Sequence, residues 1–405
     1  MTPSSGNPWL HRLALVTAVA TLGLIGIGGL VTSHEAGMAV PDWPTTYGYN
    51  MFFFPFSKWV GGVFYEHSHR LIASLVGLLT ALLAGWIWAR ETSGWQRRVG
   101  LGAIVLTLGL MGVRTQGMFI ALAVVALGVI AFSLTRLGPD PRPLRWLAAI
   151  AFAAVLVQGV LGGLRVTAMK DQLGILHGTL AQLFFTLICA LALFTSPWWR
   201  ESAAREKRSA TSAGLGGLLR GTVLLILCQL MLGASMRHQH AGLAVPDFPL
   251  AYGTLWPATD AAALERINRA RERTETRDFK PITAGQIGLH MMHRATALAI
   301  LGAVAACAWR TRRELGGAAL LSRLTAGWLG LIVVQASLGA WTVWSNKAAD
   351  IATLHVVMGS LSLACGALLT VVAFRPAVCG SENAGVALSG PGASVRASRC
   401  ESDLK

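Results

Sequence analysis

Four histidines lie in apolar stretches of the chain, where ionisable side chains are costly and usually mark function. They are His69, His177, His293 and His355. His69 and His293 each precede an arginine at the head of an apolar stretch, and His177 and His355 each follow a Gln-x-x-Leu-Gly segment. Two histidines therefore recur at matching positions in each half, which indicates two sites of the same kind.

Paired imidazoles with no other soft or anionic side chain at the same level suit the two axial positions of a haem iron. A zinc ion would need three or four ligands. Proton or metal transport through the histidines is one alternative, and ordinary helix packing is another. The residue types favour one haem between His69 and His177 and a second between His293 and His355.

The two halves differ beside the first histidine of each pair. Glu66 lies three residues before His69, on the same helical face, and the matching residue in the second half is His290. A carboxylate at one site only predicts proton-coupled chemistry there and a redox cofactor at the other. The alternative is a charge at a helix start, where the helix dipole favours it. Arg70 and Arg294 are predicted to pair with haem propionates, with a carboxylate partner or an interfacial anchor as the alternatives.

A repeated loop precedes each of these segments. Residues 36–48 read AGMAVPDWPTTYG and residues 241–253 read AGLAVPDFPLAYG, which are identical at nine of thirteen positions. The offset of 205 in a chain of 405 residues indicates a tandem duplication. Asp42 and Asp247 are placed for Asx-turns, and the prolines stiffen the chain. We expect these loops to lie as lids over the haem edges.

Other histidines in these regions are not expected to bind iron. His67 points away from His69 by helix geometry and is expected to be solvated. His34, His238 and His240 come just before the repeated loops and are expected at a pocket rim at most.

The composition is that of a membrane protein. Hydrophobic residues make up 54% of the chain and charged residues 13%, against roughly 25% charge in soluble domains. Apolar runs near 20 residues recur, and the mean hydropathy is +0.55. The net charge of +15 lies mostly in short loops, so it predicts orientation and not nucleic-acid binding. The six cysteines lie in predicted spans or the C-terminal tail without metal-ligand spacing, so disulfides are not expected.

The expected fold is an all-α polytopic membrane protein of two pseudo-symmetric four-helix bundles in tandem. The eight core spans are predicted at about 11–32, 67–89, 146–164, 173–195, 217–236, 288–309, 324–344 and 351–374. The apolar stretch 99–135 has both ends on one side, which favours an inserted helical hairpin over a re-entrant segment and gives about ten spans.

The duplication predicts three regions along the chain. Residues 1–205 form the N-terminal bundle, 206–375 the C-terminal bundle, and 376–405 a disordered cytoplasmic tail. Residues 260–278, in the second outer loop, alternate in charge and are expected to form a solvated or interfacial helix. Basic residues cluster in loops on one side, so both termini are predicted to be cytoplasmic in a bacterial plasma (inner) membrane, with the haem sites towards the outer face.

The chain resembles the haem A synthase family, membrane enzymes that convert haem O to haem A. The resemblance rests on the AVPDWPTTYG and AVPDFPLAYG loops, the EHSHR segment at 66–70, the Gln-x-x-Leu-Gly segments and the remaining paired histidines. It covers about residues 10–375 apart from the inserted hairpin. It implies an oxidoreductase that oxidises a ring methyl of haem O to a formyl group by successive hydroxylation and loss of water, for cytochrome oxidase assembly.

The resemblance also implies the contents of the two sites. It implies haem b as a cofactor between His293 and His355. It implies haem O as the substrate near His69 and His177, with Glu66 as the acidic residue of that pocket. The implied partners are membrane lipid, haem O synthase, a cytochrome oxidase subunit or assembly factor, and an electron donor or acceptor.

One departure from the family concerns the first outer loop. Many members carry a cysteine pair around the PDW motif, whereas this chain has Val40 and Thr46 at those positions, which excludes a disulfide or thiol relay there. Two other functions use the same histidines: a non-catalytic di-haem electron carrier and a haem-delivery assembly factor. Glu66, present in one half only, favours the enzyme, since a symmetric electron carrier needs no acid at one site.

Overall fold

The protein is all-α, as predicted. The computed structural model describes residues 7–137, 143–205, 212–274 and 280–374. The helices within these ranges are α1 (Pro8–Ser33), α2 (Gly62–Glu91), α3 (Gly94–Gly112), α4 (Gln116–Thr135), α5 (Pro143–Ala168), α6 (Asp171–Thr195), α7 (Pro197–Arg205), α8 (Ala213–His238), α9 (Ala261–Thr274), α10 (Ala284–Leu315), α11 (Leu320–Trp344) and α12 (Ala349–Ala373). The first outer loop adds a short antiparallel pair, β1 (Thr45–Thr46) and β2 (Tyr49–Asn50), and two 3-10 turns, Met51–Phe53 and Phe56–Lys58.

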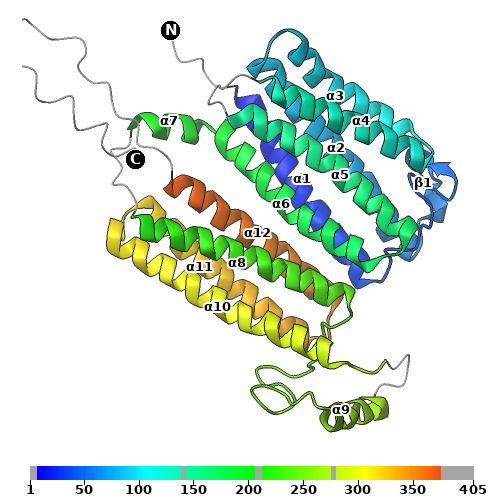
Figure 1. Ribbon diagram of the computed structural model, residues 1–405, viewed down its shortest axis with the longest axis vertical. Helices are drawn as coiled ribbons and strands as arrows, with labels where there is room; N and C mark the ends of the chain where they lie inside the picture. Colours follow the sequence, from blue (N-terminus) through cyan, green and yellow to red (C-terminus); the bar gives the residue numbers. More distant parts are fainter. Residues whose placement is uncertain (1–6, 138–142, 206–211, 275–279, 375–405) are drawn as a thin grey trace, which may run out of the picture.

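Eight long helices form two rings of four (Figure 1). In the first ring α1 packs on α2 and α6, and α5 packs on the same two helices. In the second ring α8 packs on α10 and α12, and α11 packs on the same two helices. The rings meet through α1 and α6 on one side and α8 and α12 on the other. Each ring therefore repeats the other helix for helix, as the duplication predicts.

Nine of the described helices are long and apolar enough to cross a membrane. They include all eight predicted core spans and α4 but not α3, so nine of the roughly ten predicted spans are found among the described residues. Each core helix begins two to five residues before its predicted span. A helix needs about 20 residues to cross the hydrocarbon core, so the added residues extend each core helix beyond that length. The fold class is thus that of a polytopic α-helical membrane protein.

Polar side chains in these helices bond to their own backbone. Thr17 and Thr80 are buried, and each donates its hydroxyl to the carbonyl four residues earlier, which satisfies it without a partner helix. Asn7 caps α1, and Thr283 with Gln286 forms a reciprocal capping box at the start of α10. The caps begin α1 and α10 with uncharged side chains, and the threonine bonds satisfy polar groups within the spans.

The insertion at 99–135 is a helical hairpin, the arrangement favoured over a re-entrant segment. It consists of α3 and α4, which pack on each other, with Arg114 exposed in the short turn between them. α3 packs closely on α2, since a Cβ on Gly85 would lie 2.9 Å from the Gly100 carbonyl oxygen. α4 packs on α5, so the hairpin lies against the first ring alone.

The charged segment 260–278 forms the expected helix over its described part, and residues 275–278 lie outside the described residues. α9 covers Ala261–Thr274 and lies beyond the end of the second ring (Figure 1). The predicted tail 376–405, with Cys379 and Cys400, lies outside the described residues. The four described cysteines are free thiols.

Candidate functional site

The four histidines come from diagonally opposite helices of each ring. His69 on α2 faces the interior with His177 on α6, and the two lie within electrostatic range of each other. His293 on α10 and His355 on α12 have ring centroids 6.4 Å apart, with their planes at 67°. The structure thus brings together the second predicted pair directly, and the first pair occupies the matching helices.

The second pair fits two ligands of one metal. Two imidazoles on opposite sides of an iron, each with a metal–nitrogen bond of about 2 Å, have centroids about 6 Å apart. The observed separation of 6.4 Å matches this spacing. The buried Nδ1 atoms of His69, His177 and His293 have no hydrogen-bond partner among the described residues. The donor set of each ring is therefore two imidazoles, which suits a haem better than a zinc ion.

Each of these histidines lies on a glycine of a neighbouring helix. A Cβ built on that glycine would lie 3.1–3.3 Å from the imidazole Cε1 atom in all four cases. The pairs are Gly28 with His69, Gly162 with His177, Gly233 with His293, and Gly339 with His355. A side chain larger than hydrogen would push the ring, so the four glycines fix the position of the four imidazoles.

Two glutamine side chains bond to the backbone of a paired histidine, and a third glutamine contacts an imidazole through its own backbone carbonyl. Gln158 donates its Nε2 to the His177 carbonyl at 3.1 Å, and Gln229 donates to the His293 carbonyl at 2.9 Å. The Nδ1 atom of His355 lies 3.2 Å from the carbonyl of Gln335. Such outer partners orient metal-binding histidines. Sequence analysis found two of the glutamines and missed Gln229, although residues 229–233 (QLMLG) carry the same Gln-x-x-Leu-Gly pattern.

Arg70 binds the first repeated loop and not an open pocket. Its guanidinium donates to the carbonyls of Val40, Asp42 and Thr45 at 2.7–2.8 Å. It also donates to Glu66 at 2.7 Å, which is the carboxylate pairing considered as an alternative to a propionate.

Arg294 makes the equivalent contacts in the second half. It donates to the carbonyls of Val245, Asp247 and Leu250, each of which is 205 residues beyond its counterpart in the first loop. The two arginines are therefore clamps that fix the repeated loops over the rings.

The aspartates close the same loops, but the predicted Asx-turn is wrong. Asp42 accepts from the N–H groups of Tyr47 at 2.7 Å and Gly48 at 2.9 Å, five and six residues on, and not from the residue two positions later. Asp247 accepts in the same way from Tyr252 and Gly253. The backbone at Tyr47 and Tyr252 has positive φ, which turns the following N–H groups back towards the carboxylates.

These bonds lower the pKa of both aspartates. Burial by itself raises the pKa of Asp42, but the N–H donors of Gly48 and Tyr47 and the hydroxyl of Thr45 outweigh it. The pKa of Asp247 is also below its ordinary value, because burial is outweighed by the N–H groups of Gly253 and Tyr252.

Glu66 is buried at 4% exposure, and both of its oxygens are engaged. Oε1 accepts from Arg70, and Oε2 accepts from the Val40 N–H at 2.8 Å. The carboxylate therefore joins α2 to the first outer loop. Along α2, Glu66 lies four residues before Arg70 and three before His69. In the second half His290 occupies this position and is also buried, with an unpartnered Nδ1 atom.

The expectation that His67 is solvated is wrong. Its side chain is fully buried, with Nδ1 3.2 Å from the Thr46 hydroxyl and its ring against Phe54 and Trp59. Helix geometry considers one helix alone and cannot show that the loop before α2 folds back. Its aromatic residues Phe54 and Trp59 cover this face of α2. His34, by contrast, stacks on Tyr65 at the end of α1.

The inserted hairpin supports the first loop. The indole of Trp43 packs directly on Gly163 of α5 and lies 4.6 Å, edge to face, from Phe119 of α4. In the second half Phe248 occupies the position of Trp43 and packs on Trp344 of α11, whose Nε1 donates to the Phe248 carbonyl. Each repeated loop thus rests on the helix that also carries the glycine next to the second histidine of its ring.

Two arginines beside the histidine pairs were missed by sequence analysis. Arg165, near the end of α5, packs on Gly37 and lies within electrostatic range of both His69 and His177. Arg237, near the end of α8, is in range of His355 and donates to the Gly29 carbonyl of α1. Their sequence signal is a single arginine in the last turns of an otherwise apolar span.

The chain is similar in sequence to known proteins. Three relatives named Heme A synthase illustrate the similarity. That of Caulobacter sp. (strain K31) is 24% identical over 360 residues, or 86% of this chain and 91% of the relative. That of Alkalihalophilus pseudofirmus is 21% identical over 379 residues, or 90% of this chain and 98% of the relative. That of Shewanella oneidensis is 31% identical over 159 residues, or 39% of this chain and 45% of the relative.

A family model described as cytochrome oxidase assembly protein matches residues 110–366. This match covers more than half of the chain and includes three of the four paired histidines. The chain therefore belongs to the COX15-CtaA family of cytochrome oxidase assembly proteins.

Proposed function

We propose that the protein is a haem A synthase, an oxidoreductase that converts a ring methyl of haem O to a formyl group. The observation that carries the proposal is the pair of facing histidines repeated in both rings, in a chain whose relatives are named Heme A synthase. A proton-transfer group beside one pair only gives the two sites different roles. The first ring is assigned to the substrate and the second to a resident cofactor.

His293 and His355 are proposed to hold haem b, and Arg294 fixes the loop that covers it. A bound haem supplies one-electron exchange. The glycines and Gln229 set the distance and orientation of the two imidazoles. Arg237, beside His355, is proposed to neutralise a propionate, because it is a cation at the rim of an otherwise apolar ring.

His69 and His177 are proposed to hold haem O as substrate, with Arg165 as the matching cation. Arg70 and Trp43 keep the first loop in place and exclude water from the reacting methyl group, which protects reactive intermediates. Glu66 is proposed to accept a proton released during oxidation. Its ion pair with Arg70 at 2.7 Å and the hydrogen bond that it accepts from the Val40 N–H hold the carboxylate in place one helical turn before His69.

The chain is proposed to lie in the bacterial plasma membrane with both termini in the cytoplasm. Basic loop residues favour this orientation, which puts the histidine pairs near the outer face. Haem O synthase is the expected source of substrate, and a cytochrome oxidase subunit or assembly factor is the expected recipient of the product.

The test is to co-express the chain with a haem O synthase and extract the haems. Haem A is expected from the wild-type chain. His69→Ala is expected to abolish haem A while haem b remains, and His293→Ala to remove haem b. Unchanged haem O with haem b bound would instead identify a di-haem electron carrier or a haem-delivery factor.

A further inference from the structure

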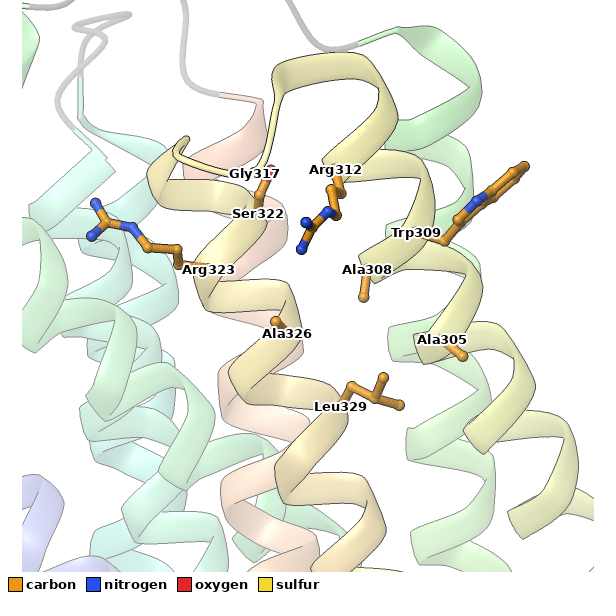
Figure 2. Close-up of a pocket in the computed structure, with 9 residues that line it drawn as sticks. All are labelled: Ala305, Ala308, Trp309, Arg312, Gly317, Ser322, Arg323, Ala326 and Leu329. Carbon is orange, nitrogen blue, oxygen red and sulfur yellow. The ribbon is translucent and has the colours of Figure 1, made fainter.

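A groove opens between α10 and α11 on the outer side of the second ring (Figure 2). Its volume is about 360 Å³. Its apolar floor is formed by Ala305 and Ala308 from α10 and by Ala326 and Leu329 from α11. Neither helix packs on α9 or on the first ring at this side, so the groove faces the surroundings of the bundle.

The charged end of the groove lies far from the histidines. Arg312 follows His293 by 19 residues on the same helix, which is roughly 28 Å at 1.5 Å per residue. That distance is close to the thickness of the hydrocarbon core. The histidines and Arg312 therefore lie near opposite membrane faces, and Arg312 is at the level of lipid headgroups on the predicted cytoplasmic side.

Cationic and aromatic side chains surround this end. The guanidinium of Arg312 hangs between the two helices above the apolar floor, while Arg323 and Trp309 extend outwards from the two rims (Figure 2). All three are exposed. Among the described residues neither Arg312 nor Arg323 has an ion-pair partner. The neighbouring carboxylate, Glu314, accepts from the Ser212 hydroxyl at 3.0 Å.

We propose that this groove binds one anionic phospholipid. Its phosphate lies against Arg312, with Arg323 adding charge, and its acyl chains lie along Ala308 and Ala326. An apolar groove on spanning helices is filled by hydrocarbon in a membrane, and unpaired arginines at headgroup level attract anionic lipid. A free phosphate would satisfy the arginines but leave the apolar floor uncovered.

The site is separate from the haem sites and does not depend on the proposed reaction. It lies on the helix that carries His293, so a bound lipid fixes the far end of that helix against α11. The expected contribution of two arginines to the affinity for an anionic headgroup is roughly 30-fold.

The test compares lipid binding by variants of the full-length protein in detergent, using native mass spectrometry. Phosphatidylglycerol and phosphatidylcholine are the probes. The variant R312Q/R323Q is expected to bind phosphatidylglycerol roughly 30-fold more weakly than wild type. The matched control R97Q/R98Q removes the same charge from exposed residues at the start of α3 and is expected to change binding less than twofold.

A third variant separates lipid from free phosphate. Ala308→Phe fills the floor and leaves both arginines, so it is expected to weaken phosphatidylglycerol binding as well. The proposal is overturned if wild type binds phosphatidylcholine as tightly as phosphatidylglycerol. It is also overturned if R97Q/R98Q weakens phosphatidylglycerol binding as much as R312Q/R323Q does, or if Ala308→Phe has no effect. Displacement of the lipid by inorganic phosphate at equal concentration would also overturn it. Circular dichroism of each variant checks that the helices remain folded, and Ala308→Phe tests the groove without any change of charge.

Discussion

At the scale of single residues, the contacts of Glu66 separate the two halves of the molecule. Its carboxylate accepts from Arg70 and from the Val40 N–H, so it positions the first outer loop as well as lying near His69. The arginine clamp is present in both halves, with the same three loop carbonyls. What differs is the carboxylate itself, which in the second half is His290.

Two substitutions of Glu66 distinguish proton transfer from positioning. Glu66→Gln keeps the shape of the side chain and one acceptor oxygen for Arg70, while its amide nitrogen cannot accept from the Val40 N–H. Most of the loop contact is retained, so the substrate haem is expected to remain bound. Haem A formation is expected to fall by roughly 10²–10⁴-fold, because the amide cannot accept the proton. Glu66→Ala is expected to lose both activity and substrate haem. The measurements are the haem absorption spectrum of the purified protein and the yield of haem A.

If Glu66→Gln formed haem A at nearly the wild-type rate, Glu66 would be a loop anchor only. The sequence-based prediction of a catalytic role would then be wrong. The burial of Glu66 would be explained by its contacts with Arg70 and the first outer loop alone.

At the scale of elements, the rings are defined by close helix approach at glycines. Each paired histidine lies on a glycine of an adjacent helix, and three of those glycines end a Gln-x-x-Leu-Gly segment whose glutamine also contacts the histidine backbone or its ring. The segment therefore provides space for the imidazole and a hydrogen bond to the same histidine, which ends on its backbone carbonyl on α5 and α8 and on its ring on α11. This explains why the motif recurs on α5, α8 and α11.

Substitution of one such glycine is expected to disturb the haem without unfolding the helix. Gly233→Ala brings a methyl group within 3.3 Å of the His293 ring, so the haem b absorption and midpoint potential are expected to shift and haem content to fall. Gly221→Ala is the matched control, because it lies on the same helix with open space beside it. The control is expected to be neutral or to stabilise the helix by about 0.5–1 kcal/mol. Equal spectra for the two variants would show that the glycine does not position the ring.

The outer loops respond to pH through their aspartates. Because the pKa of Asp247 is lowered in the folded loop, the stabilisation is present above the ordinary carboxyl range and is lost as pH falls through the lowered pKa. The melting temperature of wild type is expected to fall as the pH is lowered below about 5, where carboxylates begin to be protonated. Asp247→Asn is expected to melt lower at neutral pH and to lose less on acidification. A parallel pH response in both proteins would remove Asp247 as the cause.

At the scale of the whole molecule, Arg237 joins the two rings. It extends from α8 and donates to the Gly29 carbonyl and the Ser33 hydroxyl of α1. The first ring also packs on α12 through α1 and α6, so α12, which carries His355, contacts both halves. The two proposed haem sites are thus parts of one packed structure.

Loss of Arg237 is expected to weaken the contact between the rings. Arg237→Met removes the two hydrogen bonds, which are worth about 1–3 kcal/mol together, and leaves the Ser33 hydroxyl without its donor. A lower thermal melting midpoint is expected, measured by circular dichroism. Arg97→Met, at an exposed position on α3, is the control and is expected to leave the midpoint unchanged. The same midpoint in both variants would contradict a role for Arg237 between the rings.

Much of the architecture is predictable because its signals are local. Hydropathy located all eight core spans, and the location of both ends of 99–135 on one side favoured the hairpin that α3 and α4 form. Contacts between distant segments were not predictable in the same way. Helix geometry placed His67 in solvent because it considers one helix alone, whereas Phe54 and Trp59 of the outer loop cover that face. For the same reason the sequence did not reveal the hydrogen bond that Glu66 accepts from the Val40 N–H, or the glycine that lies next to each paired histidine.

The sequence by itself determined the order of the eight core spans, the duplication, and the recurrence of two histidines in each half. Those properties follow from chain hydropathy and from identity at a fixed offset, which need no coordinates. Only the tertiary structure decided which side chains the repeated loops bind. Arg70 and Arg294 close on carbonyls more than 20 residues away, and Glu66 adds a contact in one half only. The physical reason is that guanidinium groups removed from water need acceptors, and the packed fold alone determines which carbonyls lie within reach.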